Sequence, residues 1–491
     1  MTVARKSGSL GNQIAMYASS NVLVLAAGLL SFPITTRLLS SEQFGILTFW
    51  ESGMLVLIAI LKLGCSDGVM RFYPHNQDLA DLRHYVTNIV LPPIVLGVGG
   101  WALCLAVAMG MALCGYLDHP LLAFLALGQV MPQVWGPFAF RILQARELAA
   151  INSTLSVIWR WATVGAVLVA LFWVTQSAAG VLGAKLLVHW VVVGGLVIWL
   201  LPSLPFSAHC YDRQQISAGL SYGLPLALME LSNIALWYLD RLMMKWLLND
   251  FAAIGIYGIG FALASYIDQL MTSAISQSLT PVAIRLYATE GADAVRALKR
   301  RVLRPVTYVV FAIGTGLIAA GTDFLTMLAS ADKVDAAPVF KVVGLFFLTR
   351  ALLNIASEGL LLEKRSKTVF ALTLVAALVN GLANLLLIPM FGMMGAVYAT
   401  GVSMLGLQLL FYIYCPGDLK ALPNGAVVLR AIVASALSLS VVWVTDLFGL
   451  AHHLARFIAA GGLIALIFGL VILTDQEMRM AVRSFLYKRG P

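Results

Sequence analysis

The sequence predicts an all-α polytopic membrane protein with fourteen transmembrane helices. Of its 491 residues, 60% are hydrophobic and only 11% are charged, whereas a soluble protein carries about a quarter charged residues. Apolar runs of about 20 residues or more, long enough to cross a bilayer at about 1.5 Å per residue, recur along the whole chain. The connections between these runs are short, so the sequence predicts no soluble domain.

The fourteen predicted spans are apolar runs separated by short polar turns. They cover residues 12–36, 43–70, 85–113, 121–143, 151–173, 179–201, 219–248, 253–280, 303–328, 338–361, 367–389, 393–415, 427–448 and 455–474. The basic segment Gly291–Arg304 lies between two of them, and we expect it to form an amphipathic helix on the inner leaflet.

An internal repeat predicts two six-helix lobes. Phe44-Gly45-Ile46 is echoed by Ile254-Gly255-Ile256, and the stretch 180–184 is echoed by 392–396. We therefore predict a first lobe over residues 1–210, a second over 211–420, and a third segment, 421–491, with helices 13 and 14 and a tail. Two membrane lobes around a common site are typical of transporters.

The distribution of basic residues predicts the orientation. With both termini in the cytoplasm, about 22 Lys and Arg fall on the inner side and about 6 on the outer side, the bias expected of cytoplasmic loops. This bias explains the net charge of +9 without a nucleic-acid partner. The five cysteines are dispersed without metal-ligand spacing, and nucleotide-binding motifs are absent. The sequence thus predicts no enzyme, no catalytic or metal-binding residues and no cofactor.

The most polar span is 219–248. Glu230, Asn233, Trp237 and Arg241 fall on one helical stripe. A charged side chain in hydrocarbon costs about 2.5–3.5 kcal/mol on insertion scales, so this stripe must face protein or water. We expect it to line a polar cleft together with stripes from other helices of both lobes.

Candidate substrate-binding residues are the cations and amides inside the spans. Arg160 and Arg350 lie near mid-depth, one in each lobe, and suit phosphate because a guanidinium makes bidentate charge-assisted bonds. The other candidates are Lys62, Lys185, Asn21, Asn354, Asn380 and Asn384. The alternative is that the cations only pair with Glu51, Glu230 or Glu358 and hold helices together.

Carboxylates and prolines inside the spans are candidates for ion coupling and gating. Glu51, Glu230 and Asp268 could exchange H⁺ or Na⁺, or could form static ion pairs with Lys62 or Arg241. Arg241 belongs to the same group of gating candidates. Pro33 and Pro225, which occupy repeat-related helices, are candidate hinges, because each removes one backbone hydrogen bond; a passive kink is the alternative.

The opening of the chain resembles a known family. Its matching features are Arg37-Leu38-Leu39, Phe44-Gly45, Leu63-Gly64 and Arg71-Phe72, within the stretches PITTRLLSSEQFGILTFW and LKLGCSDGVMRFYP. In their order, and with the two-lobe repeat, they are similar to Wzx-type polysaccharide and O-antigen flippases. These form the polysaccharide-transporter branch of the multidrug/oligosaccharidyl-lipid/polysaccharide exporter superfamily.

The resemblance implies a monomeric flippase of the bacterial cytoplasmic (inner) membrane, active in exopolysaccharide or O-antigen biosynthesis. Such a protein moves a polyprenyl-pyrophosphate-linked oligosaccharide from the inner to the outer leaflet by alternating access, with other polysaccharide-assembly membrane proteins as possible partners. A lipid II flippase and an ion-coupled multidrug exporter are alternatives with the same fold. An exporter of cationic drugs predicts an acidic cleft, and a glycan polymerase or ligase predicts a large outer loop that the sequence lacks.

Overall fold

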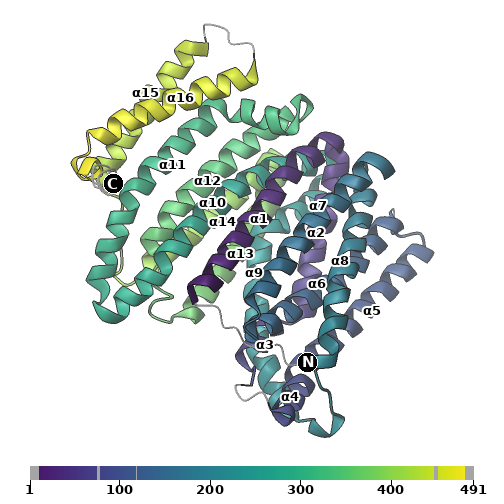
Figure 1. Ribbon diagram of the computed structural model, residues 1–491. Coiled ribbons are helices and arrows are strands. Elements are labelled where there is room, and N and C mark those ends of the chain that lie inside the picture. Colours follow the sequence, from purple (N-terminus) through teal and green to yellow (C-terminus); the bar gives the residue numbers. More distant parts are fainter. Residues whose placement is uncertain (1–9, 75–77, 118, 447–451, 481–491) are drawn as a thin grey trace. The chain divides into compact units, whose positions relative to one another are not determined.

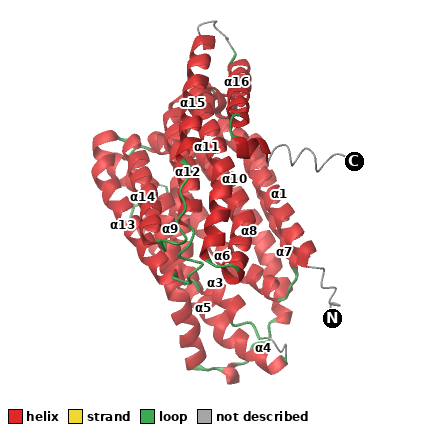
Figure 2. Cartoon of the chain, turned by 90° about the vertical axis from the view of Figure 1, so that its left-hand side faces the viewer, coloured by secondary structure: helices red, strands yellow, loops and turns green. Residues whose placement is uncertain are grey.

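The computed structural model describes residues 10–74, 78–117, 119–446 and 452–480. All regular secondary structure within these ranges is helical (Figure 2). Thirteen segments of the described chain are long and apolar enough to cross a membrane, which confirms the predicted all-α, multi-pass class. The basic termini that entered the orientation argument, with Arg5, Lys6, Arg483, Lys488 and Arg489, lie outside the described residues.

The contacts of the chain divide it into two compact units, Met1–Lys245 (unit 1) and Trp246–Pro491 (unit 2). This division falls within α9 (Arg213–Leu248). The repeat-based boundaries at residues 210/211 and 420/421 stay predictions, as does the meeting of polar stripes from both lobes in one cleft.

Unit 1 contains the first eight helices and most of α9 (Figure 1). The eight are α1 (Leu10–Leu38), α2 (Ser41–Lys62), α3 (Cys65–Arg71), α4 (Leu79–Tyr85), α5 (Leu91–Leu113), α6 (Pro120–Ala145), α7 (Ala149–Val169) and α8 (Ala178–Leu200). Two π-helical turns, η1 (Val86–Val90) and η2 (Ala170–Val174), join α4 to α5 and extend α7. The short 3₁₀ turns η3 (Leu201–Ser203) and η4 (Ala208–Cys210) precede α9.

Unit 2 contains the remaining helices (Figure 1). They are α10 (Phe251–Thr289), α11 (Ala292–Ala329), α12 (Ala337–Ser357), α13 (Ser366–Phe391), α14 (Met393–Tyr414), α15 (Gly425–Asp446) and α16 (His453–Leu473), with the 3₁₀ segment η5 (Ala331–Ala336) before α12. The expectation of an amphipathic helix on the inner leaflet over Gly291–Arg304 needs correction. This segment forms the first turns of the 38-residue helix α11 rather than a separate helix, and its Lys299 is fully buried.

One predicted span, 219–248, is not among the thirteen apolar segments. It is helical as part of α9, which is 36 residues long. Its mean hydropathy is lowered by Glu230, Asn233, Asp240 and Arg241. The helix is therefore long enough to cross a membrane but is less apolar than the thirteen segments. Its polar side chains therefore need polar partners within the protein.

The two units repeat the same pattern of helix packing. In unit 1, α2 packs on α5, α6 and α8, and α6 packs on α5 and α8. In unit 2, α10 packs on α11, α12 and α14, and α12 packs on α11 and α14. The pairs α7–α8 and α13–α14 also correspond. This recurrence is the structural counterpart of the repeat in the sequence.

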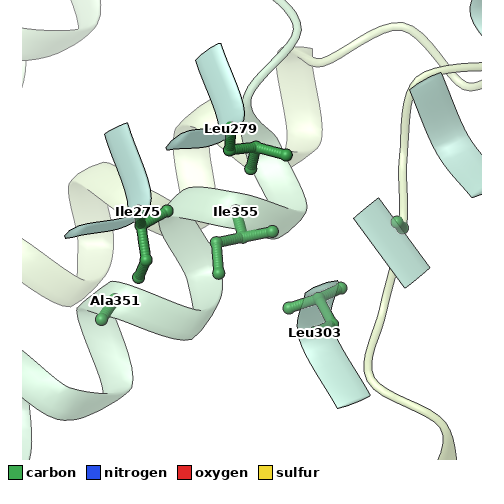
Figure 3. Packing of buried hydrophobic residues seen from close by; sticks show 6 residues of the cluster. Ile275, Leu279, Leu303, Ala351 and Ile355 are labelled. Carbon is green, nitrogen blue, oxygen red and sulfur yellow. The ribbon is translucent and has the colours of Figure 1, made fainter. Parts of the chain in front are cut away.

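The core of unit 2 shows how these helices hold together. Ile275 and Leu279 of α10, Leu303 of α11 and Ile355 of α12 meet in a buried cluster that Ala351 completes (Figure 3). The small alanine lets the larger aliphatic side chains of the neighbouring helices interdigitate, as close packing of helices requires.

Helices α15 and α16 pack on α11 through a second cluster around Tyr308, Val427 and Phe468. At one end of this hairpin, the buried Asp475 accepts hydrogen bonds from Arg304 Nε at 3.0 Å and from Tyr308 Oη at 3.1 Å. Arg430 Nη1 lies 3.4 Å from the same carboxylate. At the other end Asp323 of α11 contacts His453 Nδ1 at 2.5 Å. Both ends of the hairpin are thus tied to α11 by charged groups.

In unit 1, two glycines bring α9 against the end of α2. Leu63 and Gly64 have positive φ angles of 53° and 63° and turn the chain from α2 into α3. A Cβ on Gly64 would lie 2.1 Å from the carbonyl oxygen of Gly223, and one on Gly223 would lie 2.6 Å from Leu63 O. Only glycine permits backbones this close. The contact brings Lys62 of α2 next to Glu230 of α9.

Candidate functional site

A polar cavity of about 510 Å³ lies inside unit 1. Helices α1, α2, α6, α7 and α8 line it. The lining residues are Asn21, Val24, Glu51, Met54, Leu55, Gln129, Gln133, Phe140, Ser156, Trp159, Arg160, Thr163, Lys185 and His189. Four predicted site residues, Arg160, Lys185, Glu51 and Asn21, therefore line one cavity.

Helical periodicity explains why these side chains share a cavity. Residues four apart lie on the same helical face, and this spacing relates Gln129 to Gln133, Ser156 to Arg160 and Lys185 to His189. Each of α6, α7 and α8 thus turns one polar face inward in an otherwise apolar span.

The starts of α2 and α8 determine which charges meet. Ser40 and Ser177 cap these helices, and the backbone N–H of Ala178 donates to Gln43 Oε1 at 2.8 Å. The two helices therefore begin at the same level. Glu51 lies eight residues after Gln43, a rise of about 12 Å along α2, and Lys185 lies seven residues after Ala178, a rise of about 10.5 Å along α8. Glu51 and Lys185 consequently reach the same depth, where they form an ion pair.

The charge balance of the cavity is positive. Glu51 and Lys185 neutralise each other, and their side chains are 31% and 25% exposed. Arg160 is exposed, and no described residue forms an ion pair with it. One positive charge of the cavity wall is therefore available to an anionic ligand.

An aromatic surface forms part of the wall. The rings of Trp159 and Phe140 are parallel within 4°, with centroids 5.7 Å apart. The rings of His189 and Trp159 are nearly perpendicular, at 87°, with centroids 5.5 Å apart. Gly136 makes room for the indole, because a Cβ there would lie 3.2 Å from it. The Trp159 side chain is thus held in position from several sides.

Two polar atoms at the wall lack a hydrogen-bond partner among the described residues. They are Gln129 Oε1 and His189 Nδ1, both covered from solvent. The amide nitrogen of Gln129 is occupied, since Nε2 donates to Leu125 O at 3.0 Å. Buried polar groups are normally satisfied, so each exception calls for an explanation.

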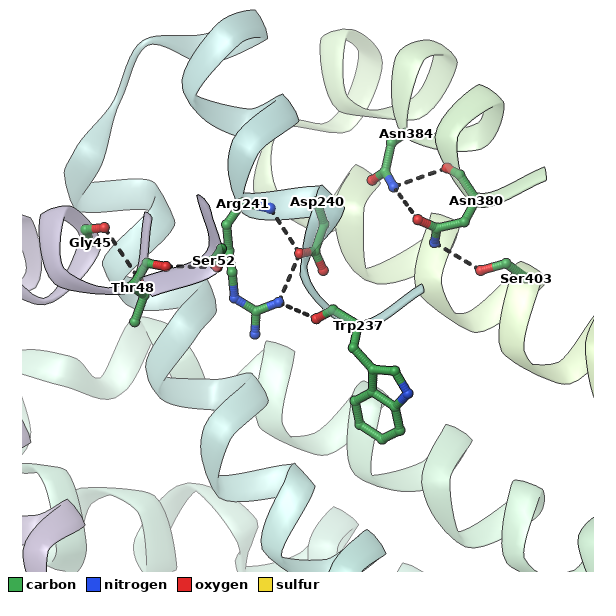
Figure 4. A network of polar contacts seen from close by, with 9 residues as sticks. All are labelled: Gly45, Thr48, Ser52, Trp237, Asp240, Arg241, Asn380, Asn384 and Ser403. Carbon is green, nitrogen blue, oxygen red and sulfur yellow. Dashed lines mark hydrogen bonds and ion pairs between the residues drawn. The ribbon is translucent and has the colours of Figure 1, made fainter. Parts of the chain in front are cut away.

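The remaining predicted site residues of unit 1 lie outside the cavity lining. Lys62 Nζ is 2.6 Å from Glu230 Oε1 and joins α2 to α9. Arg241 is buried and donates from Nη1 to Asp240 Oδ1 at 2.8 Å and to the carbonyl oxygen of Trp237 (Figure 4). The two candidate hinges, Pro33 and Pro225, are inside α1 and α9.

In unit 2 the predicted residues join helices. Arg350 Nη2 of α12 lies 2.6 Å from both carboxylate oxygens of Asp268 of α10, whose side chain is 7% exposed. Asn354 lies one turn beyond Arg350 and is half-buried. Lys62 and Lys185 pair with Glu230 and Glu51, two of the carboxylates named in the static alternative. Arg350 pairs with Asp268, which that alternative did not name as its partner. A role of these residues in substrate binding stays a prediction.

The two asparagines of α13 form a buried chain of hydrogen bonds. Asn384 Nδ2 donates to Asn380 Oδ1 at 3.0 Å, and Asn380 Nδ2 donates to Ser403 Oγ of α14 at 2.9 Å (Figure 4). Both are fully buried. These bonds join α13 to α14, and a role in substrate binding stays a prediction.

Among the lining residues that sequence reasoning missed are Gln129, Gln133, Phe140, Trp159 and His189. A usable signal was present, because the i, i+4 spacing of Gln129 with Gln133 and of Lys185 with His189 marks a polar face inside a span. The aromatic pair gave no such signal, since aromatic residues are common in apolar helices.

Comparisons with known proteins agree with this architecture. Residues 10–287, more than half of the chain, match the family model described as polysaccharide biosynthesis protein. Among curated proteins, none matches the chain in sequence.

Solved structures share the fold. A lipid II flippase MurJ in an inward closed conformation superposes with a TM-score of 0.72 at 12% identity, over 94% of this chain and 99% of that one. Multidrug resistance MATE family transporters of the MOP superfamily superpose with TM-scores of 0.60 (inward-facing) and 0.54 (outward-facing), at 14% and 13% identity. They cover 80% and 83% of this chain and 93% and 95% of their own. The chain therefore belongs to the polysaccharide biosynthesis protein family and has the fold of MurJ and of the MATE transporters.

Proposed function

We propose that the protein is a transporter rather than an enzyme, and that it flips a lipid-linked oligosaccharide. Its substrate is a glycan carried on a polyprenyl pyrophosphate, moved from the inner to the outer leaflet of the bacterial cytoplasmic membrane by alternating access. The observation that carries this proposal is the cavity in unit 1, which is polar, roomy and positively charged through Arg160. An ionised residue inside a membrane span is costly and therefore serves a function by default.

The chemistry of the cavity suits the substrate headgroup. A guanidinium makes two parallel bonds to phosphate oxygens, and Arg160 has no competing ion pair among the described residues. Lys185 can add a second positive charge when Glu51 releases it. A volume of about 510 Å³ falls within the range of about 300–1,000 Å³ typical of ligand sites.

Ion coupling is part of the same proposal. Glu51, Glu230 and Asp268 each contact a cation, namely Lys185, Lys62 and Arg350. Binding of H⁺ or Na⁺ at such a carboxylate weakens its ion pair and lets the joined helices separate. Among the three, Glu51 is the one that lines the cavity. Pro33, Pro225 and Arg241 are proposed to serve the accompanying movement of α1 and α9.

A lipid II flippase is the second candidate. The extensive superposition with MurJ favours it, and lipid II presents the same chemical elements of a pyrophosphate, sugars and a polyprenyl chain. The candidates differ in the glycan. A cationic-drug exporter is disfavoured by the positive charge of Arg160.

Deletion of the gene tests the proposal. We expect a labelled lipid-linked oligosaccharide to accumulate on the inner leaflet and disappear on complementation with the intact gene. Accumulation of lipid II in its place would assign the second candidate. No accumulation of either lipid in the deletion strain would contradict flipping altogether.

A further inference from the structure

We propose that the cavity of unit 1 contains a subsite for one pyranose ring of the glycan, with Trp159 as its platform. This inference rests on the proposed function and specifies which part of the substrate these residues bind. Arg160 binds the anionic headgroup, whereas Trp159, Gln129 and Gln133 bind a sugar.

The platform is flat, apolar and fixed in place. One face of a pyranose presents mainly C–H groups, which pack favourably on the electron-rich face of an indole. Trp159 is parallel to Phe140 and in perpendicular ring contact with His189, and Gly136 leaves the space that the indole needs. Because the ring is already fixed, little side-chain entropy is lost when a sugar packs on it.

The hydrogen-bonding groups around the platform complement a ligand rich in hydroxyl groups. The hydroxyls of Ser156 and Thr163 donate to Asn152 O at 2.8 Å and to Trp159 O at 2.7 Å, so each presents only acceptor capacity to the cavity. Gln129 Oε1, at the wall, accepts no hydrogen bond from any residue that the structure describes. A sugar hydroxyl donates to such acceptors and can accept from the amide nitrogen of Gln133.

The second unit shows that the fold does not require this polar cavity. The segments Phe44–Ile46 and Gly180–Ala184 recur 210 and 212 residues later, so Glu51, Lys185 and His189 correspond to Phe261, Val397 and Gly401. Phe261 and Val397 are buried and apolar.

At the third of these positions, an aromatic ring fills the space next to the glycine. A Cβ on Gly401 would lie 2.1 Å from the ring of Phe346. The same helical frame thus carries packed apolar side chains in unit 2 and a polar, aromatic-lined cavity in unit 1. This difference is expected if the residues of unit 1 serve a ligand rather than the fold.

The test compares two lipids on the purified full-length protein in nanodiscs. One is the lipid-linked oligosaccharide extracted from cells that carry the gene, and the other is polyprenyl pyrophosphate without sugars. We expect Trp159→Ala to raise the Kd for the glycosylated lipid by about tenfold and to leave that for the bare pyrophosphate unchanged. Trp159→Phe, which keeps a flat aromatic ring, should retain most of the wild-type affinity for the glycosylated lipid.

Control variants separate this inference from the proposed function. Trp173→Ala removes an exposed tryptophan outside the cavity lining and should change neither affinity. Arg160→Ala should weaken binding of both lipids. If Trp159→Ala leaves the affinity for the glycosylated lipid intact while Arg160→Ala weakens both, the sugar subsite is wrong and the flippase proposal stands. If neither variant weakens either lipid, both are wrong.

Discussion

At the scale of single residues, the four cations that the sequence analysis proposed for substrate binding fall into two groups. Lys62, Lys185 and Arg350 have carboxylate partners, and Arg160 faces the cavity without one among the described residues. The sequence identifies every member of this set, because charge in a span is conspicuous. It could not assign the partners, since pairing depends on which helices start at the same level.

Glu51 is the residue whose neutralisation should uncouple transport from the proton gradient. In Glu51→Gln the side chain keeps its size but can no longer take up a proton. We expect transport by vesicles that contain the variant to become insensitive to collapse of the gradient, whereas the wild type slows. Glu42→Gln, an exposed carboxylate on the same helix, is the control and should respond like the wild type. A variant that responds as strongly as the wild type would remove Glu51 from coupling.

Asp475 predicts a pH dependence of the α15–α16 hairpin. Burial by itself would raise the pKa of this carboxylate, but hydrogen bonds from Arg304, the Met478 backbone and Tyr308 outweigh it and hold the pKa below its usual value. A lowered folded-state pKa stabilises the protein at pH values above the unfolded-state pKa, near 3.8. This stabilisation is lost as the pH falls through the folded-state value.

We therefore expect wild-type thermal stability to fall as the pH is lowered toward 3, with Asp475→Asn less stable near neutral pH and less sensitive to acid. Thermal unfolding in detergent between pH 3 and pH 7 measures both effects. Asp335→Asn, an exposed acidic residue, serves as the control and should follow the wild type. Parallel pH profiles of Asp475→Asn and the wild type would show that this carboxylate contributes no pH dependence.

At the scale of elements, the close approach of α9 to the end of α2 predicts that a side chain at Gly223 destabilises the protein. In Gly223→Ala, the new Cβ would lie 2.6 Å from a backbone carbonyl and 3.2 Å from the Cys65 backbone nitrogen. Neither atom can move without shifting a helix. We expect a loss of about 1–3 kcal/mol in unfolding free energy, together with disruption of the Lys62–Glu230 pair.

Gly165→Ala is the matched control, because the space around that helical glycine is open. Alanine there should stabilise the helix by about 0.5–1 kcal/mol. Chemical denaturation in mild detergent measures both changes. Equal stability of the two variants would contradict the tight contact between α9 and the α2–α3 turn.

The sequence predicts most elements well but not their boundaries. Periodicity and apolar length are sufficient to find the spans, as the thirteen apolar segments demonstrate. They could not show that 291–304 continues into α11, because a basic amphipathic helix has the same pattern whether it ends or continues. They also could not predict the buried contacts of Lys299, which donates to the carbonyl oxygens of Glu358 and Leu419.

At the scale of the whole molecule, the two units share a packing pattern and differ in their polar groups. Corresponding helix pairs pack alike in both units, and the repeat was visible in the sequence. The cavity was only partly predictable. Its charged members stood out, whereas Trp159 and Phe140 are indistinguishable in sequence from the aromatic residues that pack the core.

The most direct test of the account is flipping of a fluorescent lipid-linked oligosaccharide by the purified protein in proteoliposomes. Arg160→Ala should reduce the rate at least tenfold without loss of thermal stability, and Arg160→Lys should retain part of it, because a lysine keeps the charge but loses the bidentate geometry. Arg83→Ala, an exposed arginine of α4 in the same unit, should flip like the wild type. Undiminished flipping by a stably folded Arg160→Ala variant would contradict the cationic cavity as the site of transport.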